Sequence, residues 1–127
     1  MPPSVVIDIR NETIKAIQQD DGQKVDLLIA DIEHANDTVI SLLKNYAIEK
    51  DHHGQVYTYN PIKTLHINED GHGGLTLFFP INVFNGCRDI NIDFNEKVHV
   101  TIDINFERKK AILTGEALMP IREPDDC

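Results

Sequence analysis

The stretch of sequence that decides the fold is KVHVTIDINF, residues 97–106. From Val98 to Phe106, apolar and polar residues alternate without interruption. Successive side chains of a β-strand point to opposite faces, so this alternation places every apolar side chain on one face. The pattern predicts a half-buried, central antiparallel strand.

The chain after position 54 supplies neighbours for this strand. Apolar and β-branched runs are separated there by Gly, Asn and Pro, the residue types that punctuate strands with turns. Pro80 lacks a backbone N–H, so it is expected at a sheet edge or a bend. Asn85-Gly86 is a favoured hairpin pair and predicts a sharp reversal, or a looser crossing with a left-handed Gly. The predicted strands are 55–59, 62–68, 75–79, 88–94, 97–106 and a last one from 111, with a Gly-rich turn at 69–74.

The apolar faces of neighbouring strands also predict their register. Placing Phe94 opposite Val98 aligns the apolar residues and leaves a three-residue loop, 95–97. On the polar face, this register sets Asp93 opposite His99 and also sets Asp89 opposite Asp103. Opposed side chains lie about 5 Å apart at Cβ, so a carboxylate–imidazole pair is expected beside a pair of carboxylates.

The following hairpin is predicted in the same way. Phe106 opposite Ala111 leaves the four-residue loop 107–110 and sets Ile104 opposite Leu113. Small residues would then face large ones across the core, as close packing favours.

Helical periodicity precedes these strands. Apolar residues recur at spacings of three and four over 24–50, which predicts a long amphipathic helix. Asn36, Asp37 and Thr38 are weak helix formers in its middle, so a bend or a break into two helices is expected there. A short helix over 12–19, with Asn11 as its N-cap, and a short strand over 5–9 come before it.

Together these elements predict an α+β fold in which an antiparallel meander sheet of about five or six strands packs on one long helix. The alternative is a half-open barrel wrapped around the helix. Without repeats or linkers, we expect a single domain, 1–127, with a frayed tail from residue 120.

Charge narrows the classes of partner. The chain of 127 residues holds 21 acidic and 12 basic residues, a formal charge of -9. Nucleic acid and anionic membranes are bound through Lys and Arg, so both are excluded as expected partners. A basic protein is favoured, because an acidic surface attracts it electrostatically. No apolar run reaches the roughly 18 residues of a membrane span, no leader pattern opens the chain, and the two cysteines form no motif; we therefore expect a cytoplasmic protein.

The predicted partner-binding surface combines the polar face of the sheet with the turn at 69–74. Carboxylates and imidazoles dominate it, which suits a basic partner. Its members are Asp89, Asp93, His99, Asp103, Glu116, Glu69, Asp70 and His72.

A metal site is the competing prediction for part of this set. Zinc and similar ions bind histidine nitrogens and carboxylate oxygens that converge. Four histidines fall close together in the sequence, although their spacing matches no zinc motif, and we predict no cofactor. These candidates are His52, His53, His66 and His72.

No residues with the spacing of a catalytic motif occur, and the sequence resembles no family that we recognise. The predicted function is a non-enzymatic, protein-binding module, such as an inhibitor or immunity-type protein for a basic partner. One alternative is a small-ligand or metal-dependent enzyme that uses His99, Asp93 and the histidines of 52–72 between sheet and helix. A second alternative is a structural subunit, a homodimer paired through the apolar edge at 77–84.

Overall fold

The computed structural model describes residues 2–50, 54–85 and 90–118. The three described helices follow one another directly and most strands come after them, a segregation that is typical of an α+β fold. Within the described residues the elements are β1 (Ser4–Asp8), α1 (Asn11–Gln18), α2 (Lys24–His34), α3 (Asn36–Lys50), β2 (Gly54–Gln55), β3 (Leu65–Ile67), β4 (His72–Asn85), β5 (Ile90–Asn105) and β6 (Lys110–Thr114).

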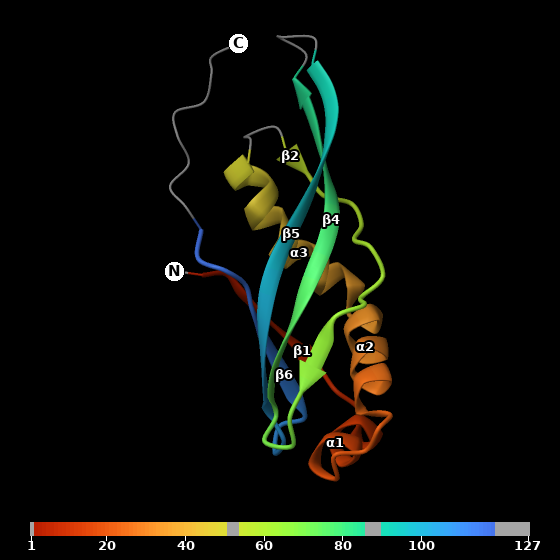
Figure 1. Ribbon diagram of the computed structural model, residues 1–127. Coiled ribbons are helices and arrows are strands. Elements are labelled where there is room, and N and C mark those ends of the chain that lie inside the picture. Colours follow the sequence, from red (N-terminus) through yellow and green to blue (C-terminus); the bar gives the residue numbers. More distant parts are fainter. Residues whose placement is uncertain (1, 51–53, 86–89, 119–127) are drawn as a thin grey trace.

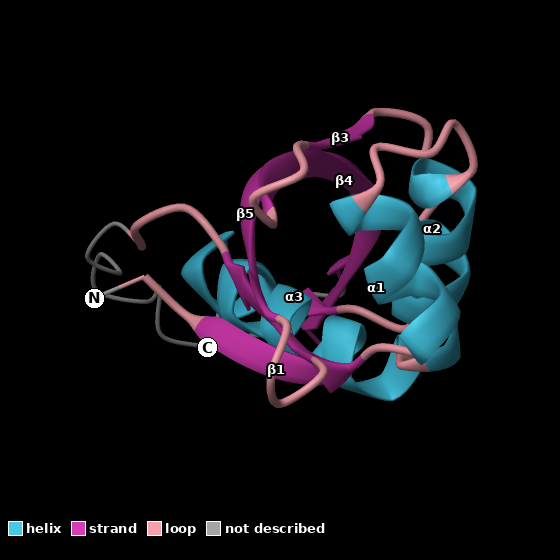
Figure 2. Cartoon of the chain, turned by 90° about the horizontal axis from the view of Figure 1, so that it is seen from below, coloured by secondary structure: helices cyan, strands magenta, loops and turns pink. Residues whose placement is uncertain are grey.

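The six strands form one antiparallel sheet in the order β1-β6-β5-β4-β2, and β3 also pairs with β4. Figure 1 shows β4 and β5 running side by side along the length of the molecule. Seen end-on in Figure 2, the sheet curls into an arc and the helices occupy its open side. The α+β prediction is confirmed, and the arrangement is the half-open barrel.

The core fills the concave side of the sheet. Alternate residues of β4 and β5 point inward, as the alternation of the sequence predicts. Helices α2 and α3 add apolar side chains from the other side. The largest fully buried side chains are Phe79, Ile17, Leu28, Ile32, Leu42, Leu43, Leu77, Ile81, Ile102, Leu113, Val39 and Val56.

The predicted long helix is two helices. Ala35 separates α2 from α3, one residue before the weak helix formers at 36–38, so the alternative of a break is the observed one. The predicted N-cap Asn11 is wrong by one residue: Arg10 is the N-cap of α1, and its side chain makes no capping hydrogen bond.

The predicted hairpin loop at 95–97 is wrong. Those residues lie inside β5, where Asn95 is opposite Pro80 and Lys97 is opposite Phe78. A continuous strand keeps the same alternation of faces and pairs this segment with β4. Asn85 is paired with Ile90 at the end of the β4–β5 ladder; the expected turn at Asn85-Gly86 falls mostly on 86–89, outside the described residues.

Pro80 lies within the ladder of β4 rather than ending it, because its missing N–H is on the side away from β5. The last hairpin is shifted by two residues from the predicted register: Ile104 is opposite Ala111, and Ile102 is opposite Leu113. A shift of two leaves every side chain on its predicted face. The loop keeps four residues, now 106–109, and within it Lys109 adopts a left-handed φ of 55°.

The remaining strand predictions hold in part. The expected strand at 5–9 is β1, whereas those at 55–59 and 62–68 shrink to the short β2 and β3. Among the helices in the described part of the chain, none has the length and apolar character needed to cross a membrane.

Candidate functional site

The convex face of the sheet is where the predicted polar residues lie. The helices occupy the opposite side, so this outer face meets solvent (Figure 2). On β5, Asp93, His99 and Asp103 are all exposed there. We expected His99 and Asp93 between sheet and helix in the enzyme alternative, and that placement is wrong because the concave side is filled by the apolar core.

The predicted pairing of Asp93 with His99 is wrong, as is that of Asp89 with Asp103. Asp93 and His99 belong to the same strand, six residues apart, which separates them by about 20 Å. Asp93 is instead opposite Asn82. Asp89 lies outside the described residues.

Asp103 and His72 do come together, across β4 and β5. The Nδ1–H of His72 donates to Oδ1 of Asp103 at 2.6 Å, and both side chains are more than half exposed. The turn that precedes His72 is held by the Asn68 side chain, which accepts hydrogen bonds from the backbone N–H groups of Asp70 and His72. Exposed Glu69 and Asp70 therefore lie at the same end of the sheet as this pair.

His99 and Glu116 form a second group of predicted residues. The hydroxyl of Thr76 and Nδ1 of His99 share a hydrogen bond of 2.8 Å. The backbone N–H of His99 donates to Oε2 of Glu116 at 3.3 Å. Glu116 follows β6, so this contact joins the end of that strand to the middle of β5.

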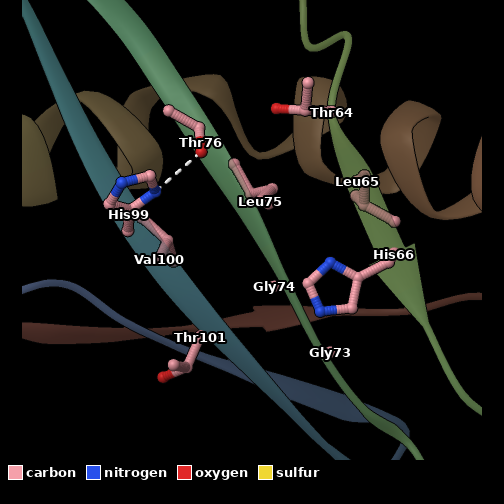
Figure 3. A pocket seen from close by; sticks show the side chains of 10 residues that line it. All are labelled: Thr64, Leu65, His66, Gly73, Gly74, Leu75, Thr76, His99, Val100 and Thr101. Atoms are coloured by element: carbon pink, nitrogen blue, oxygen red, sulfur yellow. Dashed lines mark hydrogen bonds between the residues drawn. The ribbon is translucent and has the colours of Figure 1, made fainter.

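A shallow groove of about 430 Å³ crosses the outer face between β3 and β5. We call it the outer groove. His66 stands on one side and the Thr76–His99 pair on the other, as Figure 3 shows. Gly74 lies in between, and a Cβ there would be 3.2 Å from Cε1 of His66. A side chain at this position would therefore occupy part of the groove. Its lining is Thr64, Leu65, His66, Gly73, Gly74, Leu75, Thr76, His99, Val100 and Thr101.

Of the four histidines in the metal prediction, the structure describes two. His66 and His72 lie on the outer face, while His52 and His53 lie outside the described residues. Among the described residues, no three or more His, Cys, Asp or Glu side chains are grouped so as to hold a metal ion.

Sequence reasoning named the apolar stretch 77–84 only as the edge of a homodimer, and missed that it has an exposed outer face. This face belongs to the segment that we call the arm, residues 78–85 of β4 with 90–97 of β5. Phe78 is 43% exposed and Phe84 is 59% exposed. Beside them, the Asn82 amide donates to Oδ1 of Asn91 at 3.1 Å and to Oδ1 of Asp93 at 2.8 Å. The signal was present: once the apolar residues at 77, 79, 81 and 83 face inward, those at 78 and 84 must face outward.

Comparison with known proteins adds no relative. No protein-family model matches the chain, and no curated protein or solved structure is similar to it at a significant level.

Proposed function

We propose that this chain is a protein-binding module and that the outer face of the arm is its recognition surface. The observation that carries the proposal is the exposure of Phe78 and Phe84 on a sheet face that the helices leave open. Aromatic side chains are enriched at protein interfaces, where they supply much of the binding energy by leaving water.

The polar part of the arm supports recognition of a defined partner. The Asn82 amide holds Asn91 and Asp93 in fixed positions by its two hydrogen bonds. Ordered polar groups beside apolar anchors resemble the polar rim around a protein interface. Since Asp93 is exposed and the chain carries a formal charge of -9, the partner that fits is a basic protein with an apolar pocket. A module of this kind would act as an inhibitor where binding blocks the active site of that basic protein.

The experiment is affinity capture from the native cell extract with the wild-type chain as bait, followed by mass spectrometry. The captured partner is then tested against the double variant Phe78→Ser/Phe84→Ser, which we expect to weaken binding at least about tenfold, as for loss of interface anchors. Asp93→Asn should slow association more than it speeds dissociation, because a charge at an interface rim acts mainly on the rate of encounter.

The matched control is Val6→Thr. Val6 on β1 is 55% exposed, so this variant removes exposed apolar surface away from the arm. The proposal fails if the partner binds the double variant as tightly as it binds wild type, or if Val6→Thr weakens it equally.

The outer groove favours a second candidate function, the binding of a small ligand. His66 and His99 lie on opposite sides of it, and Thr64 and Thr101 add hydroxyl groups to the lining. The test is a ligand screen by NMR that follows the imidazole signals, with Gly74→Ala as the variant that places a methyl group in the groove beside His66. A ligand that shifts the His66 and His99 signals in wild type alone supports this candidate, and a screen without such a ligand leaves the binding-module proposal as the better one.

A further inference from the structure

Within the part of the chain that the structure describes, one edge of β5 lacks a partner strand over more than half of its length. β6 pairs only with residues 101–105 of β5, whereas β4 pairs with β5 from Ile90 to Asp103. Among the described residues, no strand pairs with the other edge of residues 90–100. An edge of this length can pair with another chain.

The hydrogen bonds show which residues of β5 direct their backbone N–H groups toward this edge. The N–H of His99 donates to Glu116 at 3.3 Å, and the N–H of Lys97 donates to Oε1 of Glu96 at 3.2 Å. Backbone N–H and C=O groups alternate in direction along a strand, so Asp93 and Asn95 present theirs at the same edge. In the single chain, carboxylates thus accept two of the edge N–H groups.

The charges along this edge are complementary to a second copy of themselves. In an antiparallel pairing of two such edges, Asn95 lies on the two-fold axis and Asp93 lies opposite Lys97 of the second copy. The reverse pair, Lys97 opposite Asp93, forms by symmetry. All three residues are among those whose backbone groups point outward, so this register also satisfies the hydrogen bonding of an antiparallel ladder.

We propose that this edge pairs with a second copy of the chain in that register, which joins the two sheets into one. The inner face supports it, because Phe94 is 37% exposed beside the edge. In this register Phe94 is the diagonal neighbour of Phe94 in the other copy, a separation that aromatic side chains span. Because a strand-to-strand contact of this length is small, we expect a reversible dimer with a dissociation constant in the micromolar range.

The proposal is independent of the proposed function. Pairing at the edge leaves the outer face of each arm open, so a dimer would present two copies of the recognition surface. Asp93 belongs to both surfaces, so the two results are separated by other variants: Phe78→Ser/Phe84→Ser should change partner capture alone, and Asn95→Pro should abolish the dimer.

The test is sedimentation velocity across a concentration series with wild type and charge variants. Asp93→Lys places two lysines opposite each other twice per dimer, and Lys97→Asp does the same with two aspartates. We expect each single variant to weaken the dimer about tenfold or more, since like charges opposed in a sheet repel. The double variant Asp93→Lys/Lys97→Asp should restore it, and so should an equimolar mixture of the two single variants.

Asp26→Lys and Lys63→Asp are the matched controls, because both side chains are exposed and lie away from β5. Each control changes the net charge by the same amount as the corresponding variant of Asp93 or Lys97. A second variant, Asn95→Pro, removes an edge N–H that is not used by β4 and should abolish the dimer while circular dichroism stays unchanged.

A wild-type chain that stays monomeric at every concentration overturns the proposal and leaves the edge to a different occupant. So does a dimer that persists in both single charge variants, or one that the double variant and the mixture fail to restore.

Discussion

The hydroxyl of Thr13 donates a 2.6 Å hydrogen bond to the carboxylate of Asp31, and both side chains are buried. The same carboxylate accepts hydrogen bonds from the backbone N–H of Arg10 at 3.2 Å and from its Nε at 2.5 Å. This contact raises the pKa of Arg10 above its ordinary value, chiefly through the hydrogen bond from its side chain to Asp31. Asp31 of α2 therefore accepts hydrogen bonds from donors at the start of α1, where the N-cap residue Arg10 makes no capping hydrogen bond with its own side chain.

We expect Asp31→Ala to lower the free energy of unfolding by about 2–4 kcal/mol, because it leaves buried donors without their acceptor. Urea denaturation measures the change. Asp26→Ala, an exposed site on the same helix, is the control and should cost less than about 1 kcal/mol. Equal losses in the two variants would contradict the capping role of Asp31.

Two glycines should respond to alanine in opposite directions. Gly71 has a φ of 88°, and a Cβ there would lie 3.0 Å from Cζ of Phe106, so Gly71→Ala should destabilise by about 1–3 kcal/mol. Gly22 has nothing within 4 Å, so Gly22→Ala should stabilise by about 0.4–1 kcal/mol by restricting the unfolded chain. Thermal and urea unfolding of both variants check this, and a neutral Gly71→Ala would show that the turn relaxes freely.

Gly115 and Tyr46 should be energetically coupled. The Tyr46 hydroxyl donates to the carbonyl of Glu116 at 2.7 Å, and a Cβ on Gly115 would lie 2.9 Å from Cζ of Tyr46. Gly115→Ala must therefore displace the ring, at a cost of about 1–3 kcal/mol. In a double-mutant cycle with Tyr46→Leu, the two losses should sum to more than the loss of the double variant; strict additivity would mean that the ring and position 115 act independently.

Alkaline pH should weaken the fold through Tyr59. Burial, and to a lesser extent the negative charge of Glu33, raise the pKa of Tyr59 above its ordinary value of 10.0. The folded chain then holds this proton more tightly than the unfolded chain does, so stability is fully present below pH 10.0 and falls as the pH rises through the folded pKa.

Unfolding free energies of wild type and Tyr59→Phe, measured across the alkaline range, isolate this effect. Wild type should lose more stability than Tyr59→Phe above the ordinary tyrosine pKa, and Glu33→Gln should lessen the difference only in part. Identical pH profiles for wild type and Tyr59→Phe would rule out the shift.

Strand faces were predictable along the sheet, whereas strand lengths and partners were not. The alternation in β5 places Val98, Val100 and Ile102 inward, as expected. The same alternation fits either a hairpin at 95–97 or an uninterrupted strand, because both keep the period of two. Only a fourteen-residue partner, β4, distinguishes them.

In the candidate sites, too, the exposure of residues was predictable and their neighbours were not. The exposure of Asp93, His99 and Asp103 followed from the alternation, but their neighbours came from β4 and from the segment after β6. The alternation of residues 77–84 carried the signal for the exposed rings of Phe78 and Phe84, but it applied only once β4 was known to continue through Pro80.

The sequence by itself determined the α+β class, the helical and strand periodicities and which side chains of β5 face the core, because these depend on local geometry that repeats every few residues. The tertiary structure alone decided the register between strands, the outer groove over Gly74, the cap that Asp31 provides for α1 and the edge of β5 that no described strand pairs with. Each of these depends on contacts between residues far apart in the chain, and many registers bury the same apolar residues, so the sequence pattern cannot choose among them.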